Sequence, residues 1–296
     1  MPRTDFQDTR LAEAATVLGQ PDWYFPKAEA PVDLAFTGSR EFRFRSPLPG
    51  PWEENNSVHG RLFRAGPDWE KKPSVVLLHG WNGERQYRWQ FPSIARRLVR
   101  YGINAVMIEL PYHGRRKPNQ AGAPRNFISS DLAHTVLAAR QALADNRALL
   151  AWLAAEGSPT LGLWGFSFGG WLGGLLACHD PRIRFAALLT PVPRMDLAIE
   201  QLPFCEPLRQ GLRGSGLPLD LLDLAAHSPQ LPAADLLLIE SRYDTFVPPQ
   251  AIEELWHAWG QPEIWRLPHG HISVLMAWQV MERTVRWLRR KARAPE

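Results

Sequence analysis

Cysteine is scarce in this sequence, which has only Cys178 and Cys205 among its 296 residues. Two cysteines cannot build the disulfide framework on which small secreted domains depend. The sequence also lacks an uncharged apolar run of the ~20 residues that a membrane-spanning helix needs. Its first residues, from Met1 to Asp5, are polar, and no apolar core of signal-peptide length follows them. These absences predict a cytoplasmic protein without a membrane span.

A large excess of one charge is also absent, since the formal net charge is +4 with a pI of about 9.3. The positive charges are spread along the chain, apart from a local excess between Arg286 and Arg293. Basic residues at the end of a terminal helix complement the helix dipole, so we expect no nucleic-acid partner. Five other histidines form no cluster at zinc-like spacing, and we expect neither a metal nor an organic cofactor. These histidines are His59, His134, His179, His227 and His257.

What the sequence does contain is a regular alternation of apolar runs and amphipathic stretches. Runs such as Val75 to Leu78 are typical of strands that are buried on both faces. Strands that alternate with helices predict an α/β fold with a doubly wound, mostly parallel sheet of about eight strands. We expect a single domain over residues 1–296. The predicted strands cover 74–79, 103–109, 160–166, 184–190, 235–240 and 263–267, and the predicted helices cover 86–101, 129–155, 168–179, 249–259 and 272–292.

The N-terminal part of the chain departs from this alternation. Residues 1–39 carry few strand signals and several prolines, which predict an irregular N-terminal extension packed on the domain. Residues 41–45 and 57–64 then alternate polar and apolar side chains with a proline-rich turn between them. This pattern predicts an antiparallel hairpin at the start of the sheet.

The most informative motif is G-x-S-x-G at Gly165, Ser167 and Gly169. It follows the predicted strand 160–166 and precedes the predicted helix 168–179, as a nucleophile elbow requires. Glycine on either side of the serine leaves room for a sharp turn. The free N–H groups of the following helix point at whatever the serine attacks. The alternative interpretation of Ser167 is an ordinary serine at the start of a glycine-rich helix.

A serine hydroxyl is a weak nucleophile, and the chain contains candidates for the base and acid that would activate it. Asp244 lies just past the predicted strand 235–240, at the carboxyl end where α/β sheets place functional groups. Glu240 is its rival, although it lies earlier and within the strand. His269 and His271 both precede the terminal helix, and either could supply the imidazole.

The chain order Ser167, Asp244, His271 is the order of the triad in α/β-hydrolases. In its motifs and their order the chain resembles the α/β-hydrolase superfamily from about Arg40 to its C-terminus. The resemblance favours His271 over His269, because a Gly-His pair that enters a helix is similar to the family pattern around the catalytic histidine. The loop at 109–118 is similar to loops of bacterial dienelactone-hydrolase-like proteins and uncharacterised esterases.

The same resemblance implies an oxyanion hole made by the backbone amides of Trp81 and Phe168. Asn82, beside Trp81, is a candidate for a further donor at the substrate pocket. His113 and His269 are candidates for lining that pocket. For His113 the alternative is a structural histidine that is bonded to the backbone of its loop.

About forty residues between Pro191 and Leu231 are too many for a simple crossover. They contain helical runs near 195–201 and 217–226, broken by proline and glycine. An insertion at this place is similar to the small helical cap of an α/β-hydrolase. We therefore expect residues 191–231 to cover Ser167 and to set substrate size, with Phe204 at the pocket.

These features predict a serine hydrolase that acts on a small-molecule ester, most simply a carboxylesterase that forms an acyl-enzyme. A peptidase, thioesterase or lactonase can use the same triad, and a non-catalytic binding protein can use the same fold. Arg115, Arg116 and Lys117 would either attract an anionic substrate or form a solvated loop. Nothing in the sequence predicts an oligomeric state.

Overall fold

The computed structural model describes residues 12, 14–16, 19–20, 32–129, 131–202, 205, 206, 209 and 222–293. Most of the predicted extension at 1–39 lies outside these residues, as do the central part of the predicted insertion and Phe204. Over the part of the chain that is described, no helix is both long enough and apolar enough to cross a membrane.

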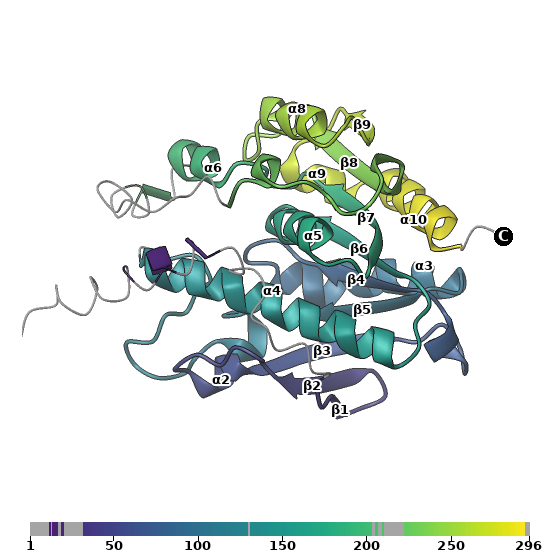
Figure 1. Cartoon of the computed structure of the whole chain (residues 1–296), viewed down its shortest axis with the longest axis horizontal. Helices are drawn as coiled ribbons and strands as arrows, with labels where there is room; N and C mark the ends of the chain where they lie inside the picture. The colour runs from purple at the N-terminus through teal and green to yellow at the C-terminus, as the bar shows by residue number, and fades with distance from the viewer. Residues whose placement is uncertain are drawn as a thin grey trace, which may run out of the picture.

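One sheet runs through the centre of the molecule (Figure 1). In the described residues it has nine strands, in the order β1-β2-β3-β5-β4-β6-β7-β8-β9. The first three pairings are antiparallel and the others are parallel, which confirms the predicted hairpin and the mostly parallel sheet. The strands are β1 (Ala35–Phe36), β2 (Glu41–Arg45), β3 (Ser57–Phe63), β4 (Ser74–Leu78), β5 (Asn104–Ile108), β6 (Leu161–Phe166), β7 (Ile183–Leu189), β8 (Leu236–Ser241) and β9 (Glu263–Leu267).

Helices cover both faces of this sheet, because alternate side chains of its strands enter two separate apolar cores (Figure 1). Val75 and Leu77 of β4 pack into the core under α3 and α10, and Val76 and Leu78 pack into the core under α4, α5 and α8. Burial on both faces explains the continuous apolar runs of the sequence. The helices are α3 (Phe91–Arg100) and α10 (Trp278–Ala292) on the first face, and α4 (Leu132–Ala155), α5 (Phe168–His179) and α8 (Pro249–Ala258) on the second.

Two predicted helices are interrupted. The first begins as a π-helical turn, η2 (Gln86–Gln90), and becomes α-helical at α3, where Pro92 sits in the first turn and needs no N–H partner. The second divides at Ala277, whose φ of −71° and ψ of 106° are extended, into α9 (His271–Met276) and α10. Neither glycine nor proline marks this second break, so the apolar pattern alone predicted one continuous helix.

The described parts of the insertion lie beside α5. Its first predicted helix is present as α6 (Met195–Gln201), and the described end of the second is a short 3-10 turn, η6 (Leu224–Ala226). The indole N–H of Trp171 on α5 donates to the carbonyl of Leu222 over 2.7 Å. This bond ties the end of the insertion to the helix that follows Ser167. The remaining short elements are α2 (Glu53–Asn56), η1 (Trp69–Lys71), η3 (Gly114–Arg116) and η7 (Ala233–Asp235).

Candidate active site

The turn between β6 and α5 holds Ser167 in a strained backbone conformation, with φ of 55° and ψ of −120°. Its N–H donates to the carbonyl of Leu189 on the neighbouring strand β7 over 2.9 Å. A Cβ on Gly165 would lie 2.3 Å from the carbonyl oxygen of Gly169, and a Cβ on Gly169 would lie 2.1 Å from that of Leu78. Only glycine fits at these two positions, as the motif led us to expect.

Three predicted side chains from distant parts of the chain meet at this turn. Ser167 Oγ lies 2.7 Å from His271 Nε2, and His271 Nδ1 lies 2.7 Å from Asp244 Oδ2. Asp244 follows β8 and His271 begins α9, so both lie near the edge of the sheet at which parallel strands place their carboxyl ends. Because a carboxylate only accepts hydrogen bonds, Nδ1 carries the proton and Nε2 presents its lone pair to the serine.

The carboxylate of Asp244 is held by backbone as well as by the imidazole. Its Oδ1 accepts hydrogen bonds from the amides of Phe246 and Val247, each over 2.8 Å. The residue is 8% exposed. These charge-assisted bonds offset the cost of burying the carboxylate and leave Oδ2 directed at His271.

The alternative acid and base occupy other places. His269 donates its N–H to the carbonyl of Leu267 and accepts from the N–H of Tyr243, so its backbone joins the segments that follow β8 and β9. Glu240 lies within β8 and faces Glu253 of α8. Burial and the neighbouring Glu253 carboxyl raise the pKa of Glu240 to about 7. The structure therefore brings Asp244 and His271, rather than these two residues, to Ser167.

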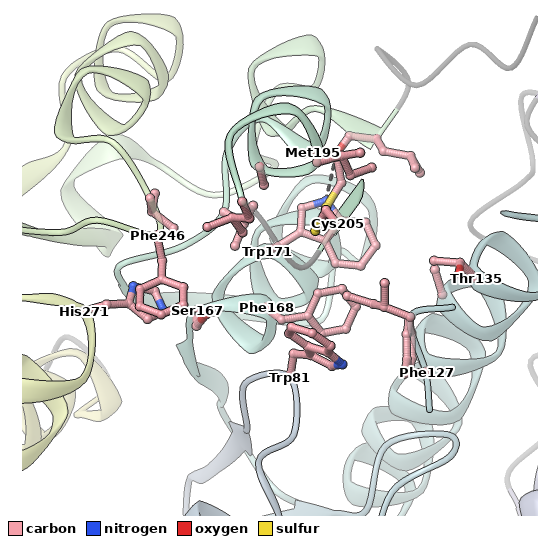
Figure 2. Close-up of a pocket in the computed structure, with 18 of the residues that line it drawn as sticks. Trp81, Phe127, Thr135, Ser167, Phe168, Trp171, Met195, Cys205, Phe246 and His271 are labelled. Carbon is pink, nitrogen blue, oxygen red and sulfur yellow. Dashed lines mark hydrogen bonds between the residues drawn. The ribbon is translucent and has the colours of Figure 1, made fainter. Parts of the chain in front are cut away.

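Two aromatic rings flank the imidazole of His271. The ring centroids of Phe166 and Phe246 each lie 5.2 Å from it. Figure 2 shows the tilted ring of Phe246 beside His271, with Ser167 close to both. Packing of this kind limits rotation of the imidazole and keeps its two nitrogens aimed at their partners.

A pocket opens beside Ser167 and His271 (Figure 2). Among the described residues that line it, no side chain is Lys, Arg, Asp or Glu. Its walls come from α4, α5, the start of α9, the insertion and the loops after β4, β5 and β8. The lining residues are Trp81, Phe127, Ile128, Thr135, Val136, Ala139, Ser167, Phe168, Trp171, Val192, Met195, Ala198, Ile199, Leu202, Cys205, Leu222, Phe246, Val247 and His271.

The predicted oxyanion residues Trp81 and Phe168 are among these lining residues, but three predicted pocket residues are not. Asn82 is exposed on the loop after β4. His113 is buried and bonded to backbone, which corresponds to its structural interpretation. His269 is half-buried at the turn described above. Phe204 lies outside the described residues.

The basic loop after β5 fits the solvated interpretation only in part, because the side chains of Arg115 and Lys117 are 47% and 38% exposed whereas Arg116 is buried. Arg116 is fully buried, with its guanidinium 2.8 Å from the carboxylate of Asp145, which is fully buried on α4. Arg115 pairs with Glu109 over 3.1 Å, and Lys117 lies 2.7 Å from the Glu84 carboxylate. Each cation is neutralised by an acidic partner, so the loop supplies no free positive field for an anionic substrate.

Sequence reasoning missed several pocket residues, including Phe127, Trp171, Met195 and Phe246. Trp171 had a usable signal, because it lies one helical turn after Ser167 on the predicted helix. Phe246 lies two residues after Asp244, on the same functional loop. Phe127 and Met195 carry no such signal, since they come from the loop before α4 and from α6, and only the tertiary fold brings these segments to one pocket (Figure 2).

A family model described as alpha/beta hydrolase domain containing 18 matches residues 25–212. The chain belongs to this family. The matched segment contains Ser167, Trp81 and Phe168, whereas Asp244 and His271 lie beyond its end. The assignment of Asp244 and His271 to the candidate site therefore depends on the sequence order and the geometry given above.

A sequence relative comes from Mycobacterium tuberculosis. It is the uncharacterized protein Rv2627c of strain H37Rv, also present as MT2702 in strain CDC 1551, and is 29% identical over 231 residues. The alignment covers 73% of this chain and 53% of the relative. The chain thus spans about half the length of these relatives.

Solved structures of esterases share the fold. An acetyl xylan esterase from Paenibacillus sp. R4 has a TM-score of 0.64 at 17% identity, covering 97% of this chain and 99% of its own. A cold-adapted esterase from an Arctic intertidal metagenomic library has a TM-score of 0.58 at 22% identity, covering 87% and 99%. The Pyrococcus furiosus esterase Pf2001 has a TM-score of 0.59 at 17% identity, covering 88% and 94%. These likenesses confirm the α/β-hydrolase fold.

Proposed function

We propose that this chain is a cofactor-independent serine hydrolase that cleaves small-molecule carboxylic esters through an acyl-enzyme. The observation that carries the proposal is the chain of contacts from Ser167 through His271 to Asp244, each 2.7 Å long, at the wall of an apolar pocket. The strained turn at Ser167 and the buried carboxylate of Asp244 support it. The esterases of the same fold are consistent with this chemistry.

In the first half of the reaction, His271 Nε2 takes the proton from Ser167 Oγ as that oxygen bonds to the ester carbonyl carbon. The carbonyl electron pair moves onto its oxygen. When this tetrahedral intermediate collapses, the bond to the leaving alkoxide breaks and His271 protonates that alkoxide. Asp244 stays ionised throughout and stabilises the imidazolium. Water then attacks the acyl-enzyme in the same way, which releases the acid and restores Ser167.

The negative oxygen of the intermediate needs donors that are already in place. We assign this role to the backbone amides of Phe168, the first residue of α5, and Trp81, in the loop after β4. The N-terminus of α5 adds the positive end of its helix dipole. Loss of one such donor costs a factor of ~10²–10³ in rate.

The pocket favours an uncharged, apolar group on one side of the scissile bond. Its walls offer aromatic and aliphatic side chains and no charged group among the described lining residues. A peptide would need partners for its backbone N–H and C=O groups, and these side chains do not supply them. Met195, Ala198 and Ile199 of α6 contribute part of the wall, so the insertion would set the length of the group that is accepted.

The test of this function is the turnover of p-nitrophenyl esters of increasing acyl length by the wild-type chain and by Ser167→Ala. We expect the wild-type chain to hydrolyse them, and Ser167→Ala to lose activity by a factor of ~10³ or more while it keeps its fold. Ser228→Ala is the matched control, because Ser228 is exposed and lies near the end of the insertion. A folded Ser167→Ala variant that keeps more than a few per cent of the activity would contradict the assignment.

The same assay separates the other hypotheses. Thioester, lactone and peptide substrates are offered alongside the esters. Faster turnover of one of these classes, still dependent on Ser167, would keep the mechanism and change the substrate class. Absence of turnover on every class would favour a non-catalytic binding protein on the hydrolase fold.

A further inference from the structure

The loop at residues 79–83, between β4 and η2, carries the Trp81 amide that the proposed mechanism uses. Asn82 has φ of 52°, in the left-handed region that asparagine tolerates better than most residues. A Cβ on Gly83 would lie 2.5 Å from both the carbonyl oxygen of Gly80 and Nδ1 of His79. The loop is therefore tightly folded, and its conformation depends on groups that hold the left-handed residue in place.

A second loop, which follows β5, holds the first through two crossed hydrogen bonds. The N–H of Asn82 donates to Nε2 of His113 over 3.2 Å, and the N–H of Leu110 donates to Nε2 of His79 over 3.2 Å. The two imidazole rings lie edge to face with their centroids 4.9 Å apart. Each loop thus supplies a histidine that accepts an amide hydrogen of the other.

These bonds require that both histidines be neutral. His79 Nδ1 lies 2.8 Å from the carbonyl oxygen of Gly80, and His113 Nδ1 lies 2.9 Å from that of Pro111. A carbonyl oxygen only accepts, so Nδ1 carries the hydrogen in each ring and Nε2 is free to accept. Burial lowers the pKa of His79 to about 3 and also lowers the pKa of His113. At neutral pH both rings are therefore in the form that these bonds need.

The second loop is itself anchored to the core. The buried guanidinium of Arg116, which pairs with Asp145, also donates to the backbone carbonyls of Glu109 over 3.0 Å and Asn55 over 2.7 Å. The N–H of Tyr112 donates to the side-chain oxygen of Asn55 over 3.1 Å. These contacts fix the loop on both sides of His113, so that its Nε2 is a rigid acceptor.

We propose that His113 is a positioning residue for the oxyanion hole, which sets the direction of the Trp81 amide by accepting the adjacent N–H of Asn82. This inference rests on the proposed hydrolase function. The Asn82 amide belongs to the peptide plane that follows Trp81, so fixing that plane fixes one of the two backbone torsions of Trp81. The left-handed conformation of Asn82 is retained because His113 satisfies its amide.

An oxyanion-hole donor that becomes mobile lowers the rate less than a donor that is deleted. Deletion of an oxyanion donor lowers the rate by a factor of ~10²–10³, so loss of the His113 contact should lower kcat by a factor of ~10–100. The Michaelis constant should change less than about threefold, because the hydrogen bond to the oxyanion is strongest in the transition state.

The test uses two substitutions at His113 and one control. His113→Phe keeps a buried ring and removes the acceptor, whereas His113→Gln places an amide oxygen near the position of Nε2. His179→Phe is the matched control, because His179 is a partly buried histidine at the opposite end of α5 from Ser167. Each variant is assayed with a matched pair of ester and thionoester, since the sulfur of a thionoester is a poor hydrogen-bond acceptor and gains little from an oxyanion hole. Amide hydrogen exchange at Asn82 is measured in parallel.

We expect His113→Phe to lower kcat for the ester more than for the thionoester and to speed exchange at Asn82. His113→Gln should restore most of both properties, and His179→Phe should change neither. Unchanged exchange at Asn82 in His113→Phe, or an equal loss on both substrates, would overturn the proposal. A wild-type chain that cleaves neither substrate would overturn the hydrolase function and this inference with it. An active wild-type chain whose His113→Phe variant behaves like wild type would overturn this inference alone.

Discussion

At the scale of single residues, the contacts of the candidate site converge on the imidazole of His271. Its two nitrogens lie 2.7 Å from Ser167 and Asp244, and the ring centroids of Phe166 and Phe246 each lie 5.2 Å from its own. The Asp244 carboxylate keeps its two backbone donors whether or not the ring is present. Removal of the ring would therefore remove the proposed base and leave the Asp244 carboxylate held by its backbone donors.

Substitution of the two neighbouring histidines should have very different effects. We expect His271→Ala to lower kcat for esters by a factor of ~10⁴–10⁶, as loss of a triad base does. His269→Ala should change kcat by less than about tenfold, because the hydrogen bonds of His269 to Leu267 and Tyr243 are made by its backbone. Steady-state kinetics on one ester, with thermal melting as a check of folding, measures both. A larger loss in His269→Ala than in His271→Ala would assign the base to His269.

At the scale of elements, α6 forms one wall of the pocket and offers a direct test of how substrate length is set. Ala198 lines the pocket, whereas Glu200 on the same helix is exposed. We expect Ala198→Trp to abolish turnover of the longest accepted acyl chains and to leave acetyl ester turnover within about threefold, because the added ring fills space without touching the triad. The measurement is kcat/KM across a series of p-nitrophenyl esters.

Glu200→Trp is the control for that series, since it adds the same ring to the exposed side of α6. It should leave the chain-length profile unchanged. An Ala198→Trp profile that matches the wild-type profile would show that α6 does not limit the acyl group.

Sequence patterns predict the bounds of the helices and strands that carry the site. They predict the contacts between these elements less well. The bounds of α5 and β9 agree with the prediction, because a glycine-flanked elbow and short apolar runs are local signals. The break at Ala277 was missed, since no residue type marks it. The burial of Arg116 was also missed, because its partner Asp145 comes from a helix that only the tertiary fold brings near. The bond from Asn82 to His113 joins loops 31 residues apart, and single-sequence patterns carry no such pairing.

At the scale of the whole molecule, one carboxyl pair makes stability depend on pH. Burial, and then the neighbouring Glu253, raise the folded pKa of Glu240 from 4.5 to about 7, while Arg266 opposes this shift. The folded chain therefore binds a proton at Glu240 that the unfolded chain has lost between about pH 4.5 and 7. Binding of this proton stabilises the folded chain. Its contribution to the free energy of unfolding is fully present below pH 4.5 and is lost as the pH rises through 7.

Replacement of that carboxyl by a neutral amide should remove this pH dependence. We expect Glu240→Gln to melt at least about 2 °C above wild type near pH 8 and to lose most of that advantage near pH 5. The substitution leaves Glu253 and its hydrogen bonds from Arg266 in place. A change in the pH dependence of melting therefore reports on Glu240. Thermal melting followed by circular dichroism at the two pH values measures the effect. A melting difference that does not change with pH would contradict the protonated state of Glu240.

The proposed mechanism depends on activation of Ser167 as a nucleophile by His271 and Asp244, and covalent labelling measures that activation. A fluorophosphonate reacts with a serine hydroxyl only where a base and an oxyanion hole support the attack. Intact mass spectrometry followed by peptide mapping should find one adduct per chain, on the peptide that contains Ser167. The adduct should be absent from Ser167→Ala and strongly reduced in His271→Ala. A wild-type chain that takes up no label, or a Ser167→Ala variant labelled as fully as wild type, would contradict an activated serine at position 167.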